Sequence, residues 1–514
     1  MKRKVNQLKA GAMLSYVQMG ISNVIGILYT PIMIRLLGQS EYGLYNLVSS
    51  VVSYLGLLSF GFGSAYVRYY TKAKNSDDEK ALGRINGMFI TIYSVIAVIA
   101  LVAGIILCLN VDIVFGSGLT PNEKSRAQIL MAFLVFTLSL SFPMSVFVSY
   151  IMANERFVFQ RVITMISTIV SPMIALPIML AGYKSIGLVV TSTVLAMVTH
   201  CVNVYFCVKK LKMKFYFKEF NFSILKEMFT FSFFIFINMI VDQINWTVDK
   251  YIVGRFVGTA GVAIYSVGAS LNNYFLSFST SISGVFAPKI HRIANAEHEN
   301  IPGLFTNLMI KVGRIQFMIL SLVLSGFIFF GKYFILDFFA GKGYENSYWV
   351  AILLMAPAIV PLIQNIGIEI QRAMNLHKSR SIIYIFIALG NLLISIPLCK
   401  RYGEIGSALG TAVALVIGNV FIMNLYYHFK MKIDMKKFWF SILKFIPALI
   451  APIVFGILCL KFITITNLFV FGGLVIAYTA IFCGSMWLFG MNASEKNLVK
   501  KPLTVVLRKL RLIK

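Results

Sequence analysis

Long apolar segments recur along the whole chain, from residues 11–34 to residues 468–489, and only short polar breaks separate them. A helix needs roughly 20 apolar residues to cross a hydrocarbon core about 30 Å thick. The chain is 58% hydrophobic and 13% charged, whereas a soluble domain is about half apolar and about a quarter charged. The sequence therefore predicts an all-α polytopic membrane protein with about fourteen transmembrane helices and no soluble domain.

We expect two pseudo-symmetric lobes of six helices and two further C-terminal helices. The N-terminal lobe covers residues 1–208, a cytoplasmic interfacial linker covers 209–228, and the C-terminal lobe covers 229–430. Helices 13 and 14 lie within 431–489, and a basic cytoplasmic tail follows in 490–514. The linker and the tail combine basic and apolar residues, which suits contact with anionic lipid. The predicted helices span residues 11–34, 42–67, 85–109, 127–151, 162–182, 186–208, 229–254, 260–286, 308–331, 347–371, 381–398, 404–428, 438–460 and 467–489.

The net charge of +28 is unevenly distributed along the chain. About 36 of the 47 Lys and Arg residues fall in alternate loops on the side of the N-terminus and about 11 on the other side, as the positive-inside rule describes. This distribution identifies a membrane, and not a nucleic acid, as the partner of the basic residues. It also predicts that both termini are cytoplasmic.

Motifs for cofactor, metal or covalent chemistry are not found in the sequence. The six cysteines lie in or beside apolar segments without metal-ligand spacing, so we predict neither a disulfide framework nor a zinc site. There is also no phosphate-binding loop and no nucleophile elbow. We expect a transporter without a cofactor, driven by an ion gradient, the membrane potential or the substrate gradient, and not an enzyme.

An internal repeat is visible at a constant offset. Arg35 to Gly38 reads Arg-Leu-Leu-Gly, and Arg255 to Gly258 reads Arg-Phe-Val-Gly, an offset of 255 − 35 = 220 residues. The same offset joins Pro177 to Pro397. An even number of helices in each copy keeps both copies in one orientation, so the pseudo-symmetry axis is expected along the membrane normal. A substrate path between the two lobes is the resulting hypothesis.

The predicted seventh helix carries a polar stripe. Asn238, Asp242, Asn245 and Asp249 follow each other at spacings that place them on one helical face. Polar and charged groups inside a membrane are costly, so such a stripe faces away from lipid. Two alternatives remain: the residues line a substrate cavity, or the two aspartates pair with basic groups on neighbouring helices. Lys250 lies near the outer end, where its side chain can reach the interface.

The predicted tenth helix carries a second polar group. Pro357 and Pro361 predict a bend, and Gln364, Asn365 and Glu369 follow as cavity candidates. Arg372 lies three residues after Glu369, a spacing at which the two can form an ion pair. The group either contributes to substrate binding or is an ordinary surface pair at the cytoplasmic end.

Two cations close predicted helices at nearly equivalent positions of the repeat. Arg68 ends the second helix, and Lys289 ends the eighth. With Arg372, these residues are candidates for binding a diphosphate, because arginine binds phosphate oxygens in a bidentate manner. The alternative is that Arg68 and Lys289 only anchor the helices at the cytoplasmic surface.

The opening Pro31-Ile-Met-Ile-Arg35-Leu-Leu-Gly38-Gln-Ser-Glu41-Tyr42-Gly43-Leu-Tyr45 and the segment 61–68 resemble the oligosaccharide flippase (polysaccharide transporter) family. Asp249 with Gly254, Gly258 and Tyr265 resembles the same family's later pattern. The family belongs to the multidrug, oligosaccharidyl-lipid and polysaccharide exporter superfamily. The resemblance implies a bacterial plasma-membrane protein that flips undecaprenyl-diphosphate-linked oligosaccharide by alternating access during surface polysaccharide biosynthesis.

The resemblance also implies partners and cargo. The implied partners are the lipid-linked oligosaccharide, membrane lipids, a coupling ion (H⁺ or Na⁺), and the polysaccharide polymerase and glycosyltransferases of the same route. Related peptidoglycan-precursor flippases carry an arginine-rich motif in the first helix, and residues 11–34 contain no arginine. That departure favours capsule, exopolysaccharide or teichoic-type repeat units over a cell-wall precursor.

Two other functions compete with the flippase. An ion-coupled multidrug or cation antiporter of the same superfamily often has an acidic residue in its first helix, and residues 11–34 contain none. A membrane-bound polysaccharide polymerase is expected to have a long outer loop with catalytic polar residues. The predicted outer loops, such as Arg401 to Glu404, are short.

Overall fold

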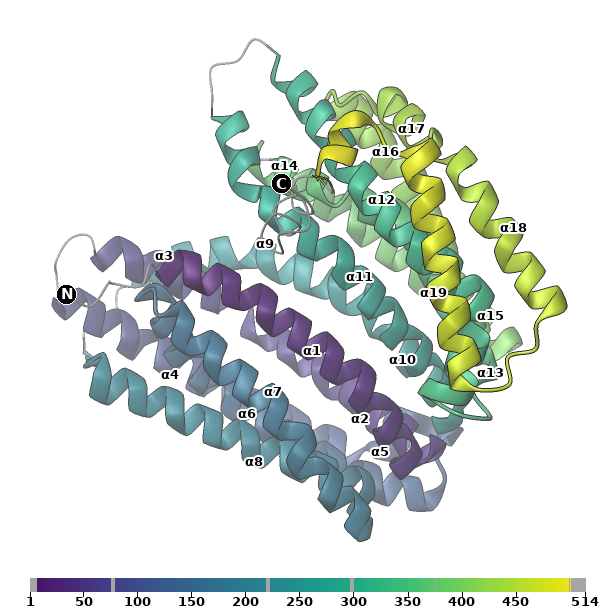
Figure 1. Ribbon diagram of the computed structural model, residues 1–514. Coiled ribbons are helices and arrows are strands. Elements are labelled where there is room, and N and C mark those ends of the chain that lie inside the picture. The colour runs from purple at the N-terminus through teal and green to yellow at the C-terminus, as the bar shows by residue number, and fades with distance from the viewer. Residues whose placement is uncertain are drawn as a thin grey trace, which may run out of the picture. The chain divides into compact units, whose positions relative to one another are not determined.

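The computed structural model describes residues 7–500 apart from 75–78, 219–221, 296–299, 375 and 499. Every regular element in these residues is helical, which confirms the predicted all-α fold class (Figure 1). Ten of these helices are long and apolar enough to cross a membrane, or up to eleven when one bent pair is included as a single span. The count of fourteen remains a prediction. The part of the predicted tail that follows residue 500 lies outside the described residues.

The chain divides into two compact units. Unit 1 contains residues 1–266 and 388–410, and unit 2 contains 267–387 and 411–514. This division by contacts does not test the predicted lobe boundaries at residues 208 and 229, which stay a prediction. The helices up to residue 256 are α1 (Gln7–Leu37), α2 (Gln39–Leu55), η1 (Gly56–Ser59), α3 (Phe62–Lys74), α4 (Glu79–Leu109), α5 (Val111–Phe115), η2 (Gly116–Gly118), α6 (Pro121–Ala153), α7 (Phe157–Ile178), η3 (Met179–Tyr183), α8 (Lys184–Tyr205), η4 (Phe206–Lys210), α9 (Phe222–Trp246) and α10 (Val248–Phe256).

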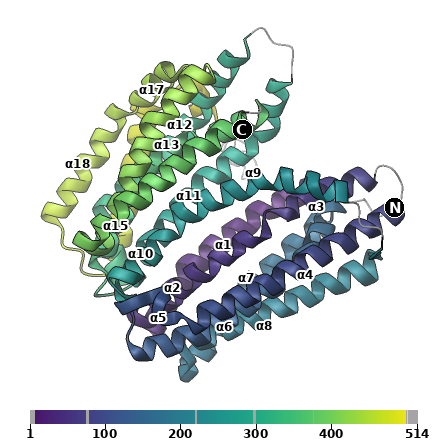
Figure 2. The same ribbon diagram turned by 180° about the vertical axis from the view of Figure 1, so that it is seen from behind.

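The rest of the chain continues with two helices that contribute to both units, α11 and α15. The elements are α11 (Thr259–Ala294), α12 (Ile301–Tyr333), η5 (Phe334–Phe339), α13 (Glu345–Ile363), α14 (Ile366–Ala373), α15 (His377–Leu415), η6 (Val416–Ile422), α16 (Met423–Leu425), η7 (Tyr426–Lys430), α17 (Met435–Leu443), α18 (Ile446–Phe462), α19 (Leu468–Ser485) and η8 (Met486–Gly490). Within unit 1, α1, α4, α6, α7 and α8 form a bundle (Figure 1). Within unit 2, α12 packs against α13 and α17 (Figure 2).

Several predicted helices are interrupted. The helix expected over 42–67 breaks at Phe60 and Gly61, whose φ angles are 49° and 68°, because glycine tolerates this conformation without a steric penalty. The bend expected at Pro357 and Pro361 stays a prediction, because both prolines lie inside α13; the helix expected over 347–371 is interrupted after them, between Ile363 and Ile366. The helix expected over 438–460 consists of α17 and α18, which meet at 41°.

Two continuous helical stretches are too long to be single spans, and each contains a glycine with a non-helical backbone conformation. The helical stretch Phe157–Lys210 has 54 residues, about 80 Å at 1.5 Å per residue, far more than a bilayer core. Gly182 in this stretch has φ 93° and ψ 0°. In the 51-residue stretch Arg380–Lys430, Gly403 has φ 61° and ψ −142°. The chain therefore turns at these two glycines, between the predicted fifth and sixth and the predicted eleventh and twelfth helices.

The 220-residue repeat is present in the local backbone of the two units. Residues 206–210 and 426–430 both form π-helical turns. Each turn is followed by a lysine with positive φ, Lys212 at 53° and Lys432 at 54°. The helices α6 and α14 end at Ala153 and Ala373, again 220 residues apart. These equivalences support duplication independently of the sequence motifs, because they involve the main-chain geometry of the two copies.

Side-chain contacts repeat at the same offset. In unit 1, Asn86 Nδ2 donates to the Lys214 carbonyl at 2.8 Å and Asn86 Oδ1 accepts from Tyr66 OH at 2.6 Å. In unit 2, Thr306 Oγ1 accepts from the backbone N–H of Asp434 at 3.1 Å. The contact of Asn86 with Lys214 and that of Thr306 with Asp434 each tie the segment after a π-helical turn to the N-terminal part of a long helix. The two segments therefore occupy equivalent places in their own units.

Candidate functional site

The polar stripe predicted for one helix is divided between two helices. Asn238, Asp242 and Asn245 lie on α9, which ends at Trp246, while Asp249 lies in the first turn of α10. Thr247 between them has φ −125° and ψ −31°, and threonine and asparagine have low helix propensity. The single helix expected over 229–254 is therefore wrong at this point. Asn238 and Asn245 are half-buried and Asp242 is exposed within the described structure.

Asp249 is buried in a polar environment within unit 1. Its carboxylate accepts hydrogen bonds from Tyr265 OH and from Ser407 Oγ, each at 2.8 Å. Asp249 is 1% exposed, and a buried carboxylate is stable only when hydrogen bonds or charges replace water. The sequence leaves cavity lining and pairing with a basic group open for Asp249. Two of its partners are hydroxyl groups on α11 and α15, a pairing that the sequence does not predict.

Further polar contacts join α9 and α10 to α2. Lys250 Nζ donates to Asn46 Oδ1 at 3.3 Å, and Gln243 Nε2 donates to Ser53 Oγ. Lys250 is half-buried, so its amine is engaged with a neighbouring helix of the same unit. Polar side chains therefore lie where α2 packs against α9 and α10, the two helices that carry the predicted stripe.

The polar residues after Pro361 lie inside unit 2. Gln364 is buried, and its Nε2 donates to Asn424 Oδ1 at 3.0 Å, an oxygen that also accepts from Trp439 Nε1 at 2.7 Å. Asn365 Nδ2 donates to Ser283 Oγ on α11 at 2.8 Å. Both residues occupy the interruption between α13 and α14, where backbone groups lack helical partners. The break therefore turns these amides toward neighbouring helices.

The predicted pair of Glu369 and Arg372 is present. Arg372 Nη1 donates to Glu369 Oε1 at 2.6 Å, and the Arg372 side chain is 61% exposed. An exposed pair at this spacing contributes little to stability. The guanidinium of Arg372 therefore meets a carboxylate of its own helix, which competes with its predicted role toward a diphosphate.

The two other predicted diphosphate-binding cations are exposed, each in its own unit. Arg68 lies on α3 of unit 1, and Lys289 lies near the end of α11 in unit 2, directly after Pro288. Exposure leaves both side chains accessible to solvent or to a ligand. This placement is compatible with phosphate binding and with simple anchoring, so both alternatives stay predictions.

Several buried charged groups were missed by the sequence analysis. Arg314 on α12 and Glu495 form a buried ion pair at 2.6 Å. Glu41 on α2 is buried and is contacted by Arg126 and by Ser185 Oγ. The rule that charges inside apolar helices are costly would have identified Arg314, which lies within the predicted helix 308–331. The partners of Arg314 and Glu41 are distant in sequence, so only the fold reveals them.

One exposed pair connects the extended segment after α8 with α4. Lys214 Nζ donates to Glu79 Oε2 at 2.7 Å, and this hydrogen bond raises the pKa of the Lys214 amine above its ordinary value. Among the residues that the structure describes, no group of three or more His, Cys, Asp or Glu side chains is arranged to hold a metal ion. The polar contacts described above are hydrogen bonds and charge pairs between amide, hydroxyl, carboxylate and basic groups.

The fold is similar to that of solved membrane transporters. The structure described as "Lipid II flippase MurJ, inward closed conformation" matches with a TM-score of 0.72 and 17% identity, over 93% of this chain and 98% of that chain. The inward-facing structure of a multidrug resistance MATE family transporter of the MOP superfamily matches with a TM-score of 0.56 and 12% identity, over 80% of this chain and 96% of that chain. At these identities the likeness concerns the fold alone. No curated protein sequence matches this chain.

The sequence itself matches one family description. The family model for "Polysaccharide biosynthesis protein" covers residues 8–294, which is more than half of the chain and includes the Arg35 to Gly38 and Arg255 to Gly258 motifs. The resemblance found in the opening motif is thereby confirmed. The chain is a multi-pass membrane protein that belongs to the polysaccharide biosynthesis protein family.

Proposed function

We propose that this protein flips undecaprenyl-diphosphate-linked oligosaccharide repeat units from the cytoplasmic to the outer leaflet of a bacterial plasma membrane by alternating access. The observation that carries the proposal is the family match over residues 8–294. The family is described as a polysaccharide biosynthesis protein, and the polytopic fold is similar to that of a protein described as a lipid II flippase. The proposal combines these two findings. A lipid-linked sugar is the cargo that unites a sugar polymer route with a membrane transport fold.

The predicted polar residues suit the chemistry of such a cargo. Amide and carboxylate groups of Asn238, Asp242 and Asn245 would bind sugar hydroxyls. Arg68 and Lys289 would meet the diphosphate, because charge-assisted hydrogen bonds to phosphate are about twice as strong as neutral ones. Movement of a negative charge outward under an inside-negative potential is favourable by about 2.3 kcal/mol per charge per 100 mV. The potential alone would therefore favour export.

Asp249 is our candidate for binding a coupling ion. It is a buried carboxylate that accepts hydrogen bonds from the neutral hydroxyls of Tyr265 and Ser407. A proton or Na⁺ would neutralise the charge of Asp249 and change these hydrogen bonds. The ion would then bind with different affinity to the two conformations of the transporter. Asp242, which is exposed on α9, is the second candidate.

The proposal includes an orientation and partners. The distribution of Lys and Arg residues predicts that both termini lie in the cytoplasm. The polysaccharide polymerase and the glycosyltransferases of the route would act on the flipped and unflipped lipid, respectively. The protein itself would perform no covalent chemistry and use no cofactor.

The decisive experiment is a liposome assay with a fluorescent undecaprenyl-diphosphate sugar. Purified protein is reconstituted, an inside-negative potential is imposed, and movement between leaflets is compared with that in empty liposomes. The expected result is protein-dependent movement that accelerates with the potential. Movement that is identical in empty and protein-containing liposomes, for several sugars of the capsule, exopolysaccharide and teichoic types, would exclude the flippase.

The second candidate is an ion-coupled multidrug or cation antiporter. The fold similarity to the MATE transporter supports it. Uptake of a cationic dye that depends on a proton or sodium gradient, without any movement of lipid-linked sugar, would favour the antiporter.

A further inference from the structure

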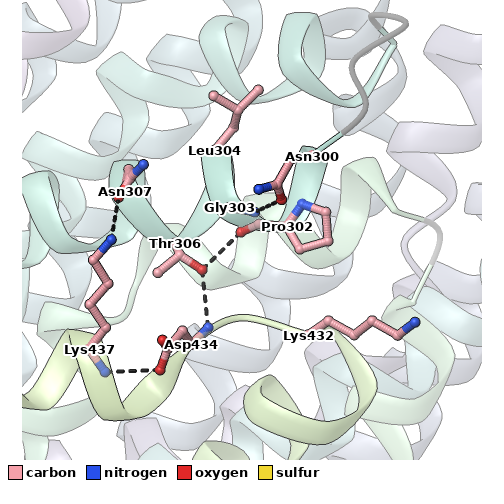
Figure 3. A pocket seen from close by; sticks show the side chains of 9 residues that line it. All are labelled: Asn300, Pro302, Gly303, Leu304, Thr306, Asn307, Lys432, Asp434 and Lys437. Atoms are coloured by element: carbon pink, nitrogen blue, oxygen red, sulfur yellow. Dashed lines mark hydrogen bonds between the residues drawn. The ribbon is translucent and has the colours of Figure 1, made fainter.

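A polar cavity lies at the start of α12 in unit 2. Its volume is about 560 Å³, and it is bounded by the first turns of α12 and by the segment that leads into α17. Six of the residues that line it have polar side chains (Figure 3): Asn300, Thr306, Asn307, Lys432, Asp434 and Lys437. None of these residues belongs to the predicted sites for sugar, diphosphate or coupling ion.

The contacts inside the cavity fix its walls. Asn300 Oδ1 accepts from the backbone N–H of Gly303 at 2.8 Å, which begins α12. Asp434 Oδ1 accepts from the backbone N–H of Lys437 at 3.0 Å, which begins α17. Thr306 joins the two walls through the backbone N–H of Asp434, at 3.1 Å. Two helix starts therefore meet in one cavity, held in place by their own capping side chains.

The internal repeat shows that an open cavity is not required by the fold at this position. In unit 1, the equivalent of Gly303 is Gly83, and Tyr216 covers it: a Cβ on Gly83 would lie 2.1 Å from Tyr216 Cδ2. The Tyr216 backbone N–H also donates to the Gly83 carbonyl at 2.9 Å. In unit 2, the three atoms nearest to a Cβ on Gly303 all belong to Asn300. In the second copy the Asn300 side chain covers the glycine in place of an aromatic ring, and the cavity lies beside it.

The polar residues of the two copies also differ. Lys437 occupies the place of Phe217, 220 residues earlier, and Asn307 occupies the place of Gly87, while Asp434 occupies the place of Lys214. Lys437 Nζ donates to Asn307 Oδ1 at 3.4 Å, and Lys432 lies on the other side of Asp434, with its amine directed away from Lys437 (Figure 3). Two ammonium groups and one carboxylate leave a net positive charge. Lysine ammonium groups and helix N-termini both favour bound phosphate.

Apolar residues beside the cavity indicate contact with lipid. Phe429 precedes Lys432 by three residues and Phe440 follows Lys437 by three, and these rings are 73% and 65% exposed. The helix α12, which begins at the cavity, is part of a candidate membrane span. A polar, positively charged cavity next to exposed aromatic residues is typical of the boundary between lipid headgroups and acyl chains.

We propose that this cavity binds the phosphodiester of an anionic glycerolipid headgroup, with the phosphate at Lys432 and Lys437. Asp434 and Asn307 accept hydrogen bonds from the headgroup hydroxyls, and the acyl chains lie along Phe429 and Phe440. The carboxylate of Asp434 disfavours a bare polyanion and favours a ligand that carries both phosphate and hydroxyl groups. The site does not depend on the proposed transport activity.

Binding is tested on the purified full-length protein by native mass spectrometry and by thermal shift. The probes are dioctanoyl phosphatidylglycerol, dioctanoyl phosphatidylcholine and glycerol 3-phosphate. We expect phosphatidylglycerol to bind more tightly than phosphatidylcholine. Because charge-assisted contacts are lost, the double variant Lys432→Gln with Lys437→Gln should lower this affinity by about tenfold or more.

The repeat supplies a matched control. Lys212 is the unit 1 equivalent of Lys432 and has the same backbone conformation, so Lys212→Gln should leave the affinity unchanged. A filling variant, Asn307→Phe, keeps both lysines but blocks the cavity, and it should also abolish binding. Asn307 is exposed, so this variant is expected to fold even if the double lysine variant does not.

The arms of the experiment separate the sources of the ligand. Glycerol 3-phosphate binding that equals lipid binding and is lost in the double variant supports the same site with a soluble phosphoester. Tighter binding of the lipid supports the membrane as the source. Equal affinity for phosphatidylcholine, undiminished affinity in both the double and the filling variant, or an equal loss in Lys212→Gln would overturn the proposal.

Discussion

Arg314 Nε donates to Glu495 Oε1 at 2.6 Å and Nη2 donates to Glu495 Oε2 at 2.9 Å, so the two side chains form a bidentate pair. Both residues are buried. The guanidinium also donates to the carbonyls of Ser441 and Gly490 at 2.6 Å and 2.9 Å, and it lies over the Phe445 ring at 4.2 Å. One arginine of α12 therefore holds the α17 segment and the chain after η8 in place within unit 2.

Removal of one member of this pair should destabilise the protein strongly. Arg314→Ala or Glu495→Ala leaves a buried charge without its partner, which typically costs about 3–5 kcal/mol. We expect a large decrease in the midpoint of thermal unfolding in detergent, measured by tryptophan fluorescence or by loss of monodisperse protein. Arg372→Ala is the control, because Arg372 belongs to an exposed pair that should contribute less than about 1 kcal/mol. An equal effect of the two substitutions would contradict a special role for the buried pair.

Gly43 should not tolerate even one additional methyl group. A Cβ on Gly43 would lie 1.8 Å from the carbonyl oxygen of Thr259, a backbone atom in the same unit. Overpacking of this kind costs about 1–3 kcal/mol, so Gly43→Ala should reduce thermal stability and the yield of folded protein. A Cβ added to Gly20 on α1 would have no neighbouring heavy atom within 4 Å among the described residues. Gly20→Ala is therefore the matched control and should change stability by less than about 1 kcal/mol.

Substitution of Asp249 should change the ion dependence of transport. Asp249→Asn removes the charge but keeps the size of the side chain, and we expect sodium- or proton-dependent transport to fall by about tenfold or more, the equivalent of one charge-assisted contact. Tyr265→Phe removes only one of its hydrogen bonds and should have a smaller effect. Transport is measured across a range of pH and sodium concentration.

Asp242→Asn and the double variant Asp242→Asn with Asp249→Asn complete the test of ion coupling. A double variant that transports as the wild type does, at every pH and sodium concentration, would contradict coupling through either carboxylate. A loss that is restricted to Asp249→Asn would assign the ion to the buried residue.

Binding of the lipid diphosphate should depend on Arg68 and Lys289. The double variant Arg68→Ala with Lys289→Ala should weaken binding by about a hundredfold or more, because two charge-assisted hydrogen bonds are lost and each contributes about 1.5–3 kcal/mol. Binding is measured with a soluble short-chain analogue of undecaprenyl diphosphate. Arg372→Ala should have a smaller effect, since Arg372 already donates to Glu369. Undiminished binding in a stably folded double variant would leave Arg68 and Lys289 as membrane anchors.

The sequence alone determined the class of fold and the duplication. Apolar segments of about 20 residues leave a chain little choice but helices across a bilayer, and this signal is local and repeated. The family was also visible in a short motif around Arg35 and Gly38, because glycine at a helix end is a local requirement: Gly38 has φ 79° and its equivalent Gly258 has φ 98°.

Only the tertiary structure decided where helices break and which polar groups meet. The interruption at Thr247, which moves Asp249 from α9 to α10, carries no strong local signal such as proline. Glu495 lies 181 residues from Arg314 and Ser407 lies 158 residues from Asp249 in sequence, and periodicity within one helix does not specify contacts over such separations. The cavity at Lys432 arises because Tyr216 has no counterpart over Gly303. Local patterns determine which segments become helices, whereas packing between helices determines which of their polar residues form a site.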